Sequence, residues 1–241
     1  MVNFGGSFSV NALFESQTYR DEVQAVAAGL RGLPEGMDPY PYASCAWVFE
    51  QIRRGGGLGI FCHPYWFARL KYDVPRDLVD LIFERQPYDA LELLGGYHPH
   101  EEESNQLQVM RWAEELSRGR RMPVVGVSDA HGCETGELFG WFWTLVFAES
   151  CALPDLVTNI REMYSVAVSS IPGQTPRAFG SFRLARYAQF LLREVLPLHD
   201  DLCEEEGRLL LAHAAGDSAA AGALAHLNGR VDALYRMLWA G

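Results

Sequence analysis

Short apolar segments alternate with amphipathic segments through about the first 170 residues of this 241-residue chain. The apolar segments have the length and composition of buried strands, and the segments between them show the apolar spacing of helices. Strands are predicted at 57–64, 89–96, 123–131, 141–149 and 164–170. Helices are predicted at 13–30, 43–57, 76–86, 103–119 and 154–163, and a loop rich in proline and glycine at 31–42. Repeated strand–helix units predict an α/β fold with a mostly parallel sheet, either open or closed into a barrel.

Polar side chains gather where three of these strands end. Four of the seven histidines follow the apolar parts of predicted strands, namely His63, His98, His100 and His131. Asp129 accompanies the last of them. Because ligands bind at the carboxyl ends of strands in parallel α/β folds, this edge of the sheet is the expected position of a site.

The stretch VVGVSDAHG (124–132) places Asp129 and His131 two residues apart. In an extended chain these two side chains would point to the same face. A carboxylate oxygen beside an imidazole nitrogen suits a divalent ion such as Zn, Mn or Fe. The alternative is that Asp129 caps the following helix and that His131 is an ordinary loop histidine.

The stretch GIFCHPYW (59–66) ends a second strand with His63 followed by Pro64. A proline disfavours the helical conformation for the residue before it, which predicts an extended His63 at the rim of the sheet. Cys62 is expected to point the opposite way, into the core.

Taken together, four motifs resemble the PHP family (polymerase and histidinol phosphatase) of metal-dependent phosphoesterases. They are CHPYW (62–66), DALELLGG (89–96), SDAHG (128–132) and GWFWTLVFA (140–148), and the similar region runs from about residue 43 to residue 170. The resemblance implies a distorted (β/α)7 barrel with Zn, Mn or Fe ions at its carboxyl rim. It also implies that His63, Asp129 and His131 are metal ligands, with Asp129 and His131 at the catalytic centre. The implied reaction is attack of a metal-bound hydroxide on a small phosphorylated substrate.

The chain departs from the family at its beginning. PHP enzymes open with an HxH motif, whereas the first histidine of this chain is His63. We therefore expect a partial barrel built from the later βα units. Two explanations stay open: the chain is a fragment of a longer enzyme, or it is a degenerate relative that serves as a binding or oligomerisation module without catalysis.

Three further residues are candidates for the same site. The segment YHPHEEES (97–104) contains an HxH of its own, and His98 and His100 could stand in for missing ligands if this loop folds over the rim. The favoured alternative is an acidic loop that caps the helix beginning near Glu103. Glu92 alternates with Leu91 and Leu93, and is either a residue of the barrel mouth or a structural acid.

The amino-acid composition of the chain changes after Ile171. Residues 1–171 are assigned to the PHP-like α/β domain, and the Ala/Leu-rich residues 172–241 to a helical extension. This extension is expected to form three or four amphipathic helices that pack on the domain or on a second copy of the chain.

The amino-acid composition limits the classes of partner and the cellular compartment expected for this chain. The formal net charge of −11 argues against a nucleic acid as the main partner, although a metal ion could still attract a phosphorylated small molecule. The five cysteines include no CxxC pair, which favours a reducing compartment. No signal peptide and no membrane-spanning apolar run are recognised, so a cytoplasmic location without a membrane partner is expected.

Overall fold

The computed structural model of the protein describes residues 2–5, 17–68, 70–98, 101–132 and 138–239. The chain divides into two compact units, Met1–Leu184 and Ala185–Gly241. The predicted site residues belong to the first unit, except that His100 lies outside the described residues.

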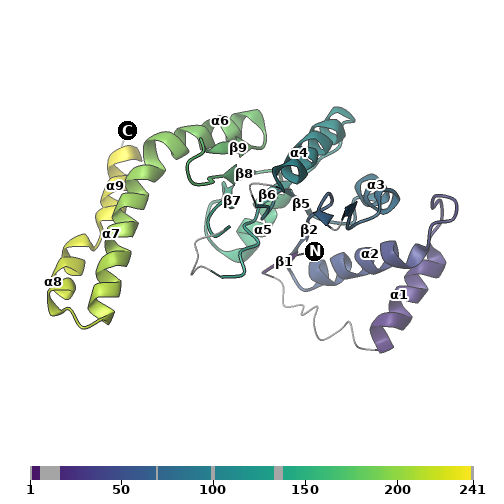
Figure 1. Ribbon diagram of the computed structural model, residues 1–241, viewed down its shortest axis with the longest axis horizontal. Helices are drawn as coiled ribbons and strands as arrows, with labels where there is room; N and C mark the ends of the chain where they lie inside the picture. The colour runs from purple at the N-terminus through teal and green to yellow at the C-terminus, as the bar shows by residue number, and fades with distance from the viewer. Residues whose placement is uncertain (1, 6–16, 69, 99–100, 133–137, 240–241) are drawn as a thin grey trace. The chain divides into compact units, whose positions relative to one another are not determined.

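The main sheet of the first unit has four strands in the order β1-β2-β5-β6 (Figure 1). These strands are β1 (Val2–Phe4), β2 (Leu58–Phe61), β5 (Ala90–Leu94) and β6 (Val124–Gly126). Strands β2, β5 and β6 run parallel, and β1 pairs with β2 in the antiparallel sense. The carboxyl ends of the three parallel strands therefore meet at one edge.

Helices from the first unit pack against both faces of this sheet. They are α1 (Gln17–Gly29), α2 (Pro39–Arg54), α3 (Arg76–Arg85), α4 (Glu102–Ser117) and α5 (Leu153–Arg161). Because successive strand residues point to opposite faces, Phe61, Leu91 and Leu93 join a large core with residues of α2 and α3. Ile60, Cys62 and Ala90 instead join a smaller core with residues of α5.

A second, antiparallel sheet contains β7 (Phe142–Val146), β8 (Ser165–Ser169) and β9 (Arg177–Phe179). Side chains connect it to β6. The Thr144 hydroxyl accepts from the Gly126 amide (3.0 Å) and donates to the Gly126 carbonyl (2.8 Å), while Ser165 donates to the Val124 carbonyl (2.7 Å). A Cβ atom on Gly126 would lie 2.4 Å from the Trp143 carbonyl oxygen, so this close approach requires glycine.

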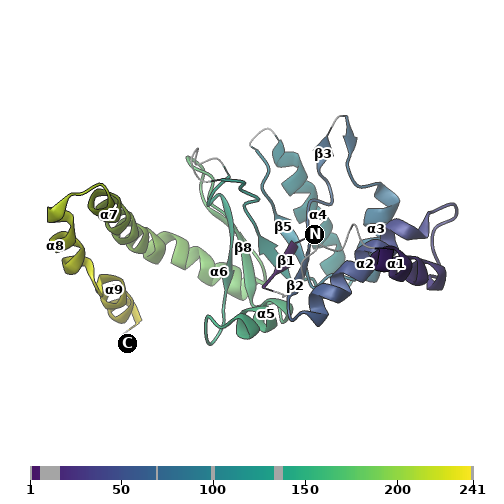
Figure 2. The ribbon, with the colours of Figure 1, turned by 90° about the horizontal axis from the view of Figure 1, so that it is seen from below.

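A short hairpin, β3 (Phe67–Ala68) and β4 (Lys71–Tyr72), follows β2 and projects from the first unit (Figure 2). It was not predicted from the sequence, and neither were β1 and β9.

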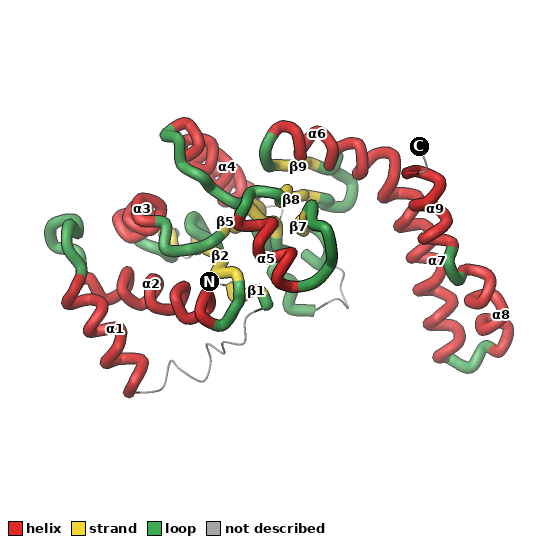
Figure 3. Tube along the Cα trace, turned by 180° about the vertical axis from the view of Figure 1, so that it is seen from behind, coloured by secondary structure: helices red, strands yellow, loops and turns green. Residues whose placement is uncertain are grey.

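The second unit is helical (Figure 3). Helix α6 (Phe182–Phe190) enters it and continues through a π-helical turn (Leu191–Val195) into α7 (Leu196–Ala214). Two shorter helices, α8 (Ser218–Leu227) and α9 (Arg230–Trp239), pack on α7. In neither unit does a described helix have the length and apolarity needed to cross a membrane.

The predicted α/β class is confirmed. The sheets formed by the described residues are open, and the partial PHP-like barrel stays a prediction. The loop at 31–42 was predicted too long, because α2 already begins at Pro39 after the N-cap Asp38, whose carboxylate accepts from the Tyr40 amide (2.9 Å). Prolines are tolerated in the first turn of a helix, where the missing N–H would have no intrahelical partner.

Candidate functional site

The parallel strands bring three predicted site residues to one edge of the sheet. His63 lies two residues beyond the end of β2, Asp129 lies three residues beyond the end of β6, and Glu92 lies within β5 between them. The structure therefore brings these residues to the expected edge of the sheet, and the function of this edge stays a prediction.

Glu92 is fully buried, with 0% of its surface exposed. Neither of its carboxylate oxygens accepts a hydrogen bond of sound geometry from the described residues. Burying an ionised carboxylate without compensation costs at least several kcal/mol, roughly the whole stability margin of a small domain. A positive charge or a proton must therefore accompany this side chain.

The imidazole of His63 lies between two carboxylates. Its Nδ1 is 2.8 Å from Oε1 of Glu92, and its Nε2 is 3.5 Å from Oδ2 of Asp129. Burial alone would lower the pKa of His63, but the Glu92 carboxylate, followed by that of Asp129, outweighs this effect and raises the pKa. The site therefore stabilises positive charge at its centre.

Backbone conformation directs His63 toward Glu92. Had β2 continued, His63 would have followed Phe61 onto the face opposite Cys62 and Glu92. Instead, its φ of 52° lies in the left-handed region, and the turn brings the imidazole to the Glu92 carboxylate. The prediction that Pro64 holds His63 extended is therefore wrong, because the contact with Glu92 overrides the local preference.

Asp129 has the same left-handed φ of 52°. Strand β6 ends at Gly126, so Asp129 and His131 lie in a loop, and the argument that they share one face of a strand does not apply. Both side chains nevertheless line one pocket.

This pocket, the rim pocket, has a volume of about 300 Å³. It is lined by His63, Trp66, Gly96, Tyr97, His98, Glu101, Asp129, His131 and Leu138. Four of the predicted site residues thus meet there, with Glu92 buried behind His63. The His98 amide also donates to the Glu101 carboxylate (3.3 Å) just before α4, whose N-cap residue Glu101 makes no side-chain capping hydrogen bond, and the capping role of this loop stays a prediction.

Polar residues of α4 hold the end of β5 in place. The Asn105 side chain accepts from the Gly95 amide (2.8 Å) and donates to the Gly95 carbonyl (3.2 Å). Gln108 donates to the carbonyls of Glu92 (3.0 Å) and Leu93 (3.1 Å). These supporting residues were missed from the sequence, although two polar residues three apart on the buried face of a helix are a usable signal.

Tyr97 is a second residue that sequence reasoning missed. Its ring centroid lies 5.6 Å from that of His63 in an edge-on arrangement, and its hydroxyl donates to the Gln108 side chain (3.0 Å). The tyrosine therefore limits the positions open to the imidazole.

The contrast with Glu115 shows what is unusual about Glu92. Glu115 is also fully buried, but three guanidinium groups surround its carboxylate, those of Arg111 (2.8 Å), Arg118 (2.8 Å) and Arg120 (3.1 Å). Glu115 is thus a structural acid with its charge compensated, whereas Glu92 has a single imidazole.

These residues fit a cation only in part. The uncompensated carboxylate of Glu92 and the imidazole facing it are a suitable pair of donors for Zn, Mn or Fe. Throughout the described residues, however, no three His, Cys, Asp or Glu side chains are placed to hold a metal ion together. A bound ion would therefore require Asp129 or His131 to move inward.

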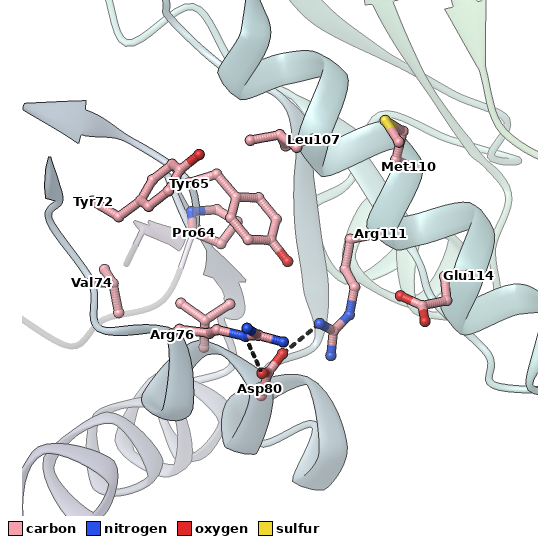
Figure 4. A pocket seen from close by; sticks show the side chains of 11 residues that line it. Pro64, Tyr65, Tyr72, Val74, Arg76, Asp80, Leu107, Met110, Arg111 and Glu114 are labelled. Atoms are coloured by element: carbon pink, nitrogen blue, oxygen red, sulfur yellow. Dashed lines mark hydrogen bonds and ion pairs between the residues drawn. The ribbon is translucent and has the colours of Figure 1, made fainter.

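A second cavity of about 480 Å³ lies between α3, α4 and the β3–β4 hairpin (Figure 4). Its wall is mostly apolar, and Tyr65 and Tyr72 meet edge to face at 6.4 Å between ring centroids. Its central carboxylate, Asp80, already pairs with Arg76 (3.5 Å) and Arg111 (2.5 Å). The cavity is therefore lined mainly by apolar surface, and its central carboxylate is already engaged in ion pairs.

No family model matches the chain, and no curated protein or solved structure matches it significantly.

Proposed function

We propose that this chain binds a divalent metal ion at the rim pocket and hydrolyses a phosphate ester there, on a fold built like the later βα units of a PHP barrel. The supporting observation is the fully buried Glu92 carboxylate, which receives no hydrogen bond of sound geometry from the described residues and has the Nδ1 atom of His63 at 2.8 Å. A metal ion would supply the missing positive charge.

Within this proposal, Glu92 and His63 hold the ion from the buried side, and Asp129 completes the set from the exposed side. A divalent ion in such a site activates a water molecule and offsets negative charge on a phosphoryl group. His131 lines the same pocket, and within this proposal it is a further metal ligand or the group that assists the leaving-group oxygen. A pocket of about 300 Å³ suits a small substrate.

The test compares metal content and hydrolysis in matched variants. Purified protein is incubated with Zn²⁺ or Mn²⁺, freed of excess metal, and measured by elemental analysis and with p-nitrophenyl phosphate. We expect Glu92→Gln and Asp129→Asn to lose both bound metal and hydrolysis. Glu115→Gln is the control, since it changes an equally buried carboxylate distant from the rim pocket, and it should keep both. Equal metal content in the wild type and Glu92→Gln would overturn the proposal.

A second candidate is a binding module without catalysis. It is favoured by the pairing of His63 with Glu92, to which the described residues add no third ligand, since a protonated imidazole can itself compensate the carboxylate. In that case neither protein binds metal, and Glu92→Gln lowers only the melting temperature.

A further inference from the structure

The second unit has almost no core of its own. Among its described residues, only Ala188, Val195 and Ala220 are buried, and neither α7 nor α9 buries a side chain. A unit this small with so few buried side chains needs apolar burial from elsewhere, and association between copies of a chain is a common source. Part of its surface is therefore expected to be an interface.

Helices α8 and α9 cover one side of α7 (Figure 1 and Figure 3). On that side, the Tyr235 ring stacks on the His199 ring with 5.9 Å between centroids. With 3.6 residues per turn, Asp201, Glu204 and Leu211 lie on the side of α7 turned away from His199. All three are exposed, and Leu211 has 75% of its surface exposed.

Helix α6 is covered on one side in a similar way. The Trp239 indole of α9 donates to the Tyr187 hydroxyl (3.2 Å), and the neighbouring Ala188 is fully buried. Arg186 lies on the side away from these contacts, and Arg193, seven residues later, returns to that side. Both arginines are exposed. We call this side of α6 and α7 the outward face.

Charge of opposite sign is separated along the outward face. Residues 185–193 include Arg186, Arg193 and no acid, whereas residues 200–206 include five acids and no basic residue. The first segment leads into the second through the π-helical turn, so both belong to one continuous helical stretch. Arg193 pairs with its neighbour Glu194 (2.5 Å), but such a surface pair contributes little and does not exclude a further partner.

We propose that two copies of the chain pair through the outward face, in antiparallel orientation about a two-fold axis. This orientation sets the basic segment of each copy against the acidic segment of the other, so the same attraction forms twice. A parallel pair would instead set like charges together. Phe190, which is 44% exposed beside the face, and Leu211 would lose contact with water, which supplies apolar burial that the unit lacks.

A second copy fits the outward face better than the first unit does. The first unit carries most of the formal net charge of −11, and it therefore repels the acidic segment 200–206. A second copy offers a segment of each sign in the matching order. Because this pairing uses the second unit alone, it does not depend on the rim pocket or on the proposed function.

The experiment measures the molar mass of the full chain by light scattering at low ionic strength, where charge pairs are least screened. We expect twice the chain mass of 27.0 kDa. The double variant Arg186→Glu, Arg193→Glu makes both segments acidic, and the double variant Asp201→Lys, Glu204→Lys reverses the charge of the outward face of α7. Each double variant alone should have the mass of one chain. Arg236→Glu, which reverses an exposed charge on α9, is the control and should keep the mass of two chains.

A mixture of the two double variants tests the antiparallel arrangement directly. Their outward faces are complementary to each other, so the mixture should recover the mass of two chains, which also shows that both variants are folded. A wild-type chain with the mass of one chain would overturn the proposal. A dimer that persists in either double variant alone, or a mixture that stays at the mass of one chain, would overturn it as well.

Discussion

A Cβ atom on Gly96 would lie 2.5 Å from the Cβ atom of Asp129 and 2.0 Å from the carbonyl oxygen of Ser128. The loops that follow β5 and β6 therefore touch through a position where only glycine fits. This contact fixes the distance between the Glu92 strand and the Asp129 loop, and so the geometry of the rim pocket.

Gly96→Ala is expected to weaken metal binding at the rim pocket by about tenfold or more, because the Asp129 loop must move away. Overpacking of this kind typically costs about 1–3 kcal/mol of unfolding free energy. Calorimetric titration with Mn²⁺ and urea denaturation measure the two effects. Gly29→Ala is the control, since a Cβ there meets nothing within 4 Å; it should leave the affinity unchanged and should not lower the unfolding free energy. Unaltered affinity in Gly96→Ala would contradict the role given to this contact.

Thr144→Val is expected to destabilise the first unit by about 1–3 kcal/mol, because the Gly126 amide and carbonyl lose their hydroxyl partner. Thr144→Ser retains the hydroxyl and should cost clearly less. Urea denaturation compares the two variants, and equal losses would mean that packing of the methyl group matters more than the hydrogen bonds.

Glu115→Gln is expected to lower the unfolding free energy by about 3 kcal/mol, because three arginine side chains lose a buried counter-charge. Glu114→Gln is the matched change on the same helix. Glu114 pairs with Arg118 at the surface (2.6 Å), so its loss should stay below about 1 kcal/mol. Chemical denaturation of both variants checks the difference, and similar losses would argue against the buried network.

Alkaline pH is expected to destabilise the first unit through buried tyrosines. Burial, followed by the Glu115 carboxylate, raises the pKa of Tyr88 far above its usual value of 10, and burial, followed by Glu92, does the same for Tyr97. Above about pH 10 the unfolded chain loses these protons while the folded chain retains them. Each tyrosine therefore lowers the unfolding free energy by about 1.4 kcal/mol per pH unit.

Denaturation between pH 9 and pH 11 measures this slope. Tyr88→Phe should reduce the slope of unfolding free energy against pH by the contribution of one tyrosine, about 1.4 kcal/mol per pH unit. This reduction is independent of the absolute stability of the variant. A slope unchanged by Tyr88→Phe would contradict the attribution of alkaline destabilisation to Tyr88.

The positions of most strands could be predicted from the sequence because apolar runs with polar ends are a local signal, but the separate antiparallel sheet of β7, β8 and β9 was not expected, because pairing partners are set by tertiary packing. Strands β2, β5 and β6 were expected where they occur, and so were the positions of His63 and Asp129 after two of them. The hairpin at Phe67–Ala68 and Lys71–Tyr72 was missed, because strands of two residues carry no periodicity.

The geometry of the candidate site could not be predicted in the same way. The pairing of His63 with Glu92 depends on a left-handed residue, and local preference before Pro64 points to the opposite conformation. Whether the buried Glu92 carboxylate receives hydrogen bonds depends on the donors that other helices and strands bring near it. Those donors are set by tertiary packing and not by the local sequence. Glu115, an acid of the same type, is instead surrounded by arginines.

The shared left-handed conformation of His63 and Asp129 also has a consequence for genetic selection. A residue at either position must meet two requirements: its backbone must tolerate a positive φ, and its side chain must have the right chemistry. Glycine tolerates a positive φ but has no functional side chain, whereas valine and isoleucine neither tolerate a positive φ nor supply a polar group. A library that tolerates glycine for folding but rejects it for fitness would therefore mark these two positions as functional before any substrate is known.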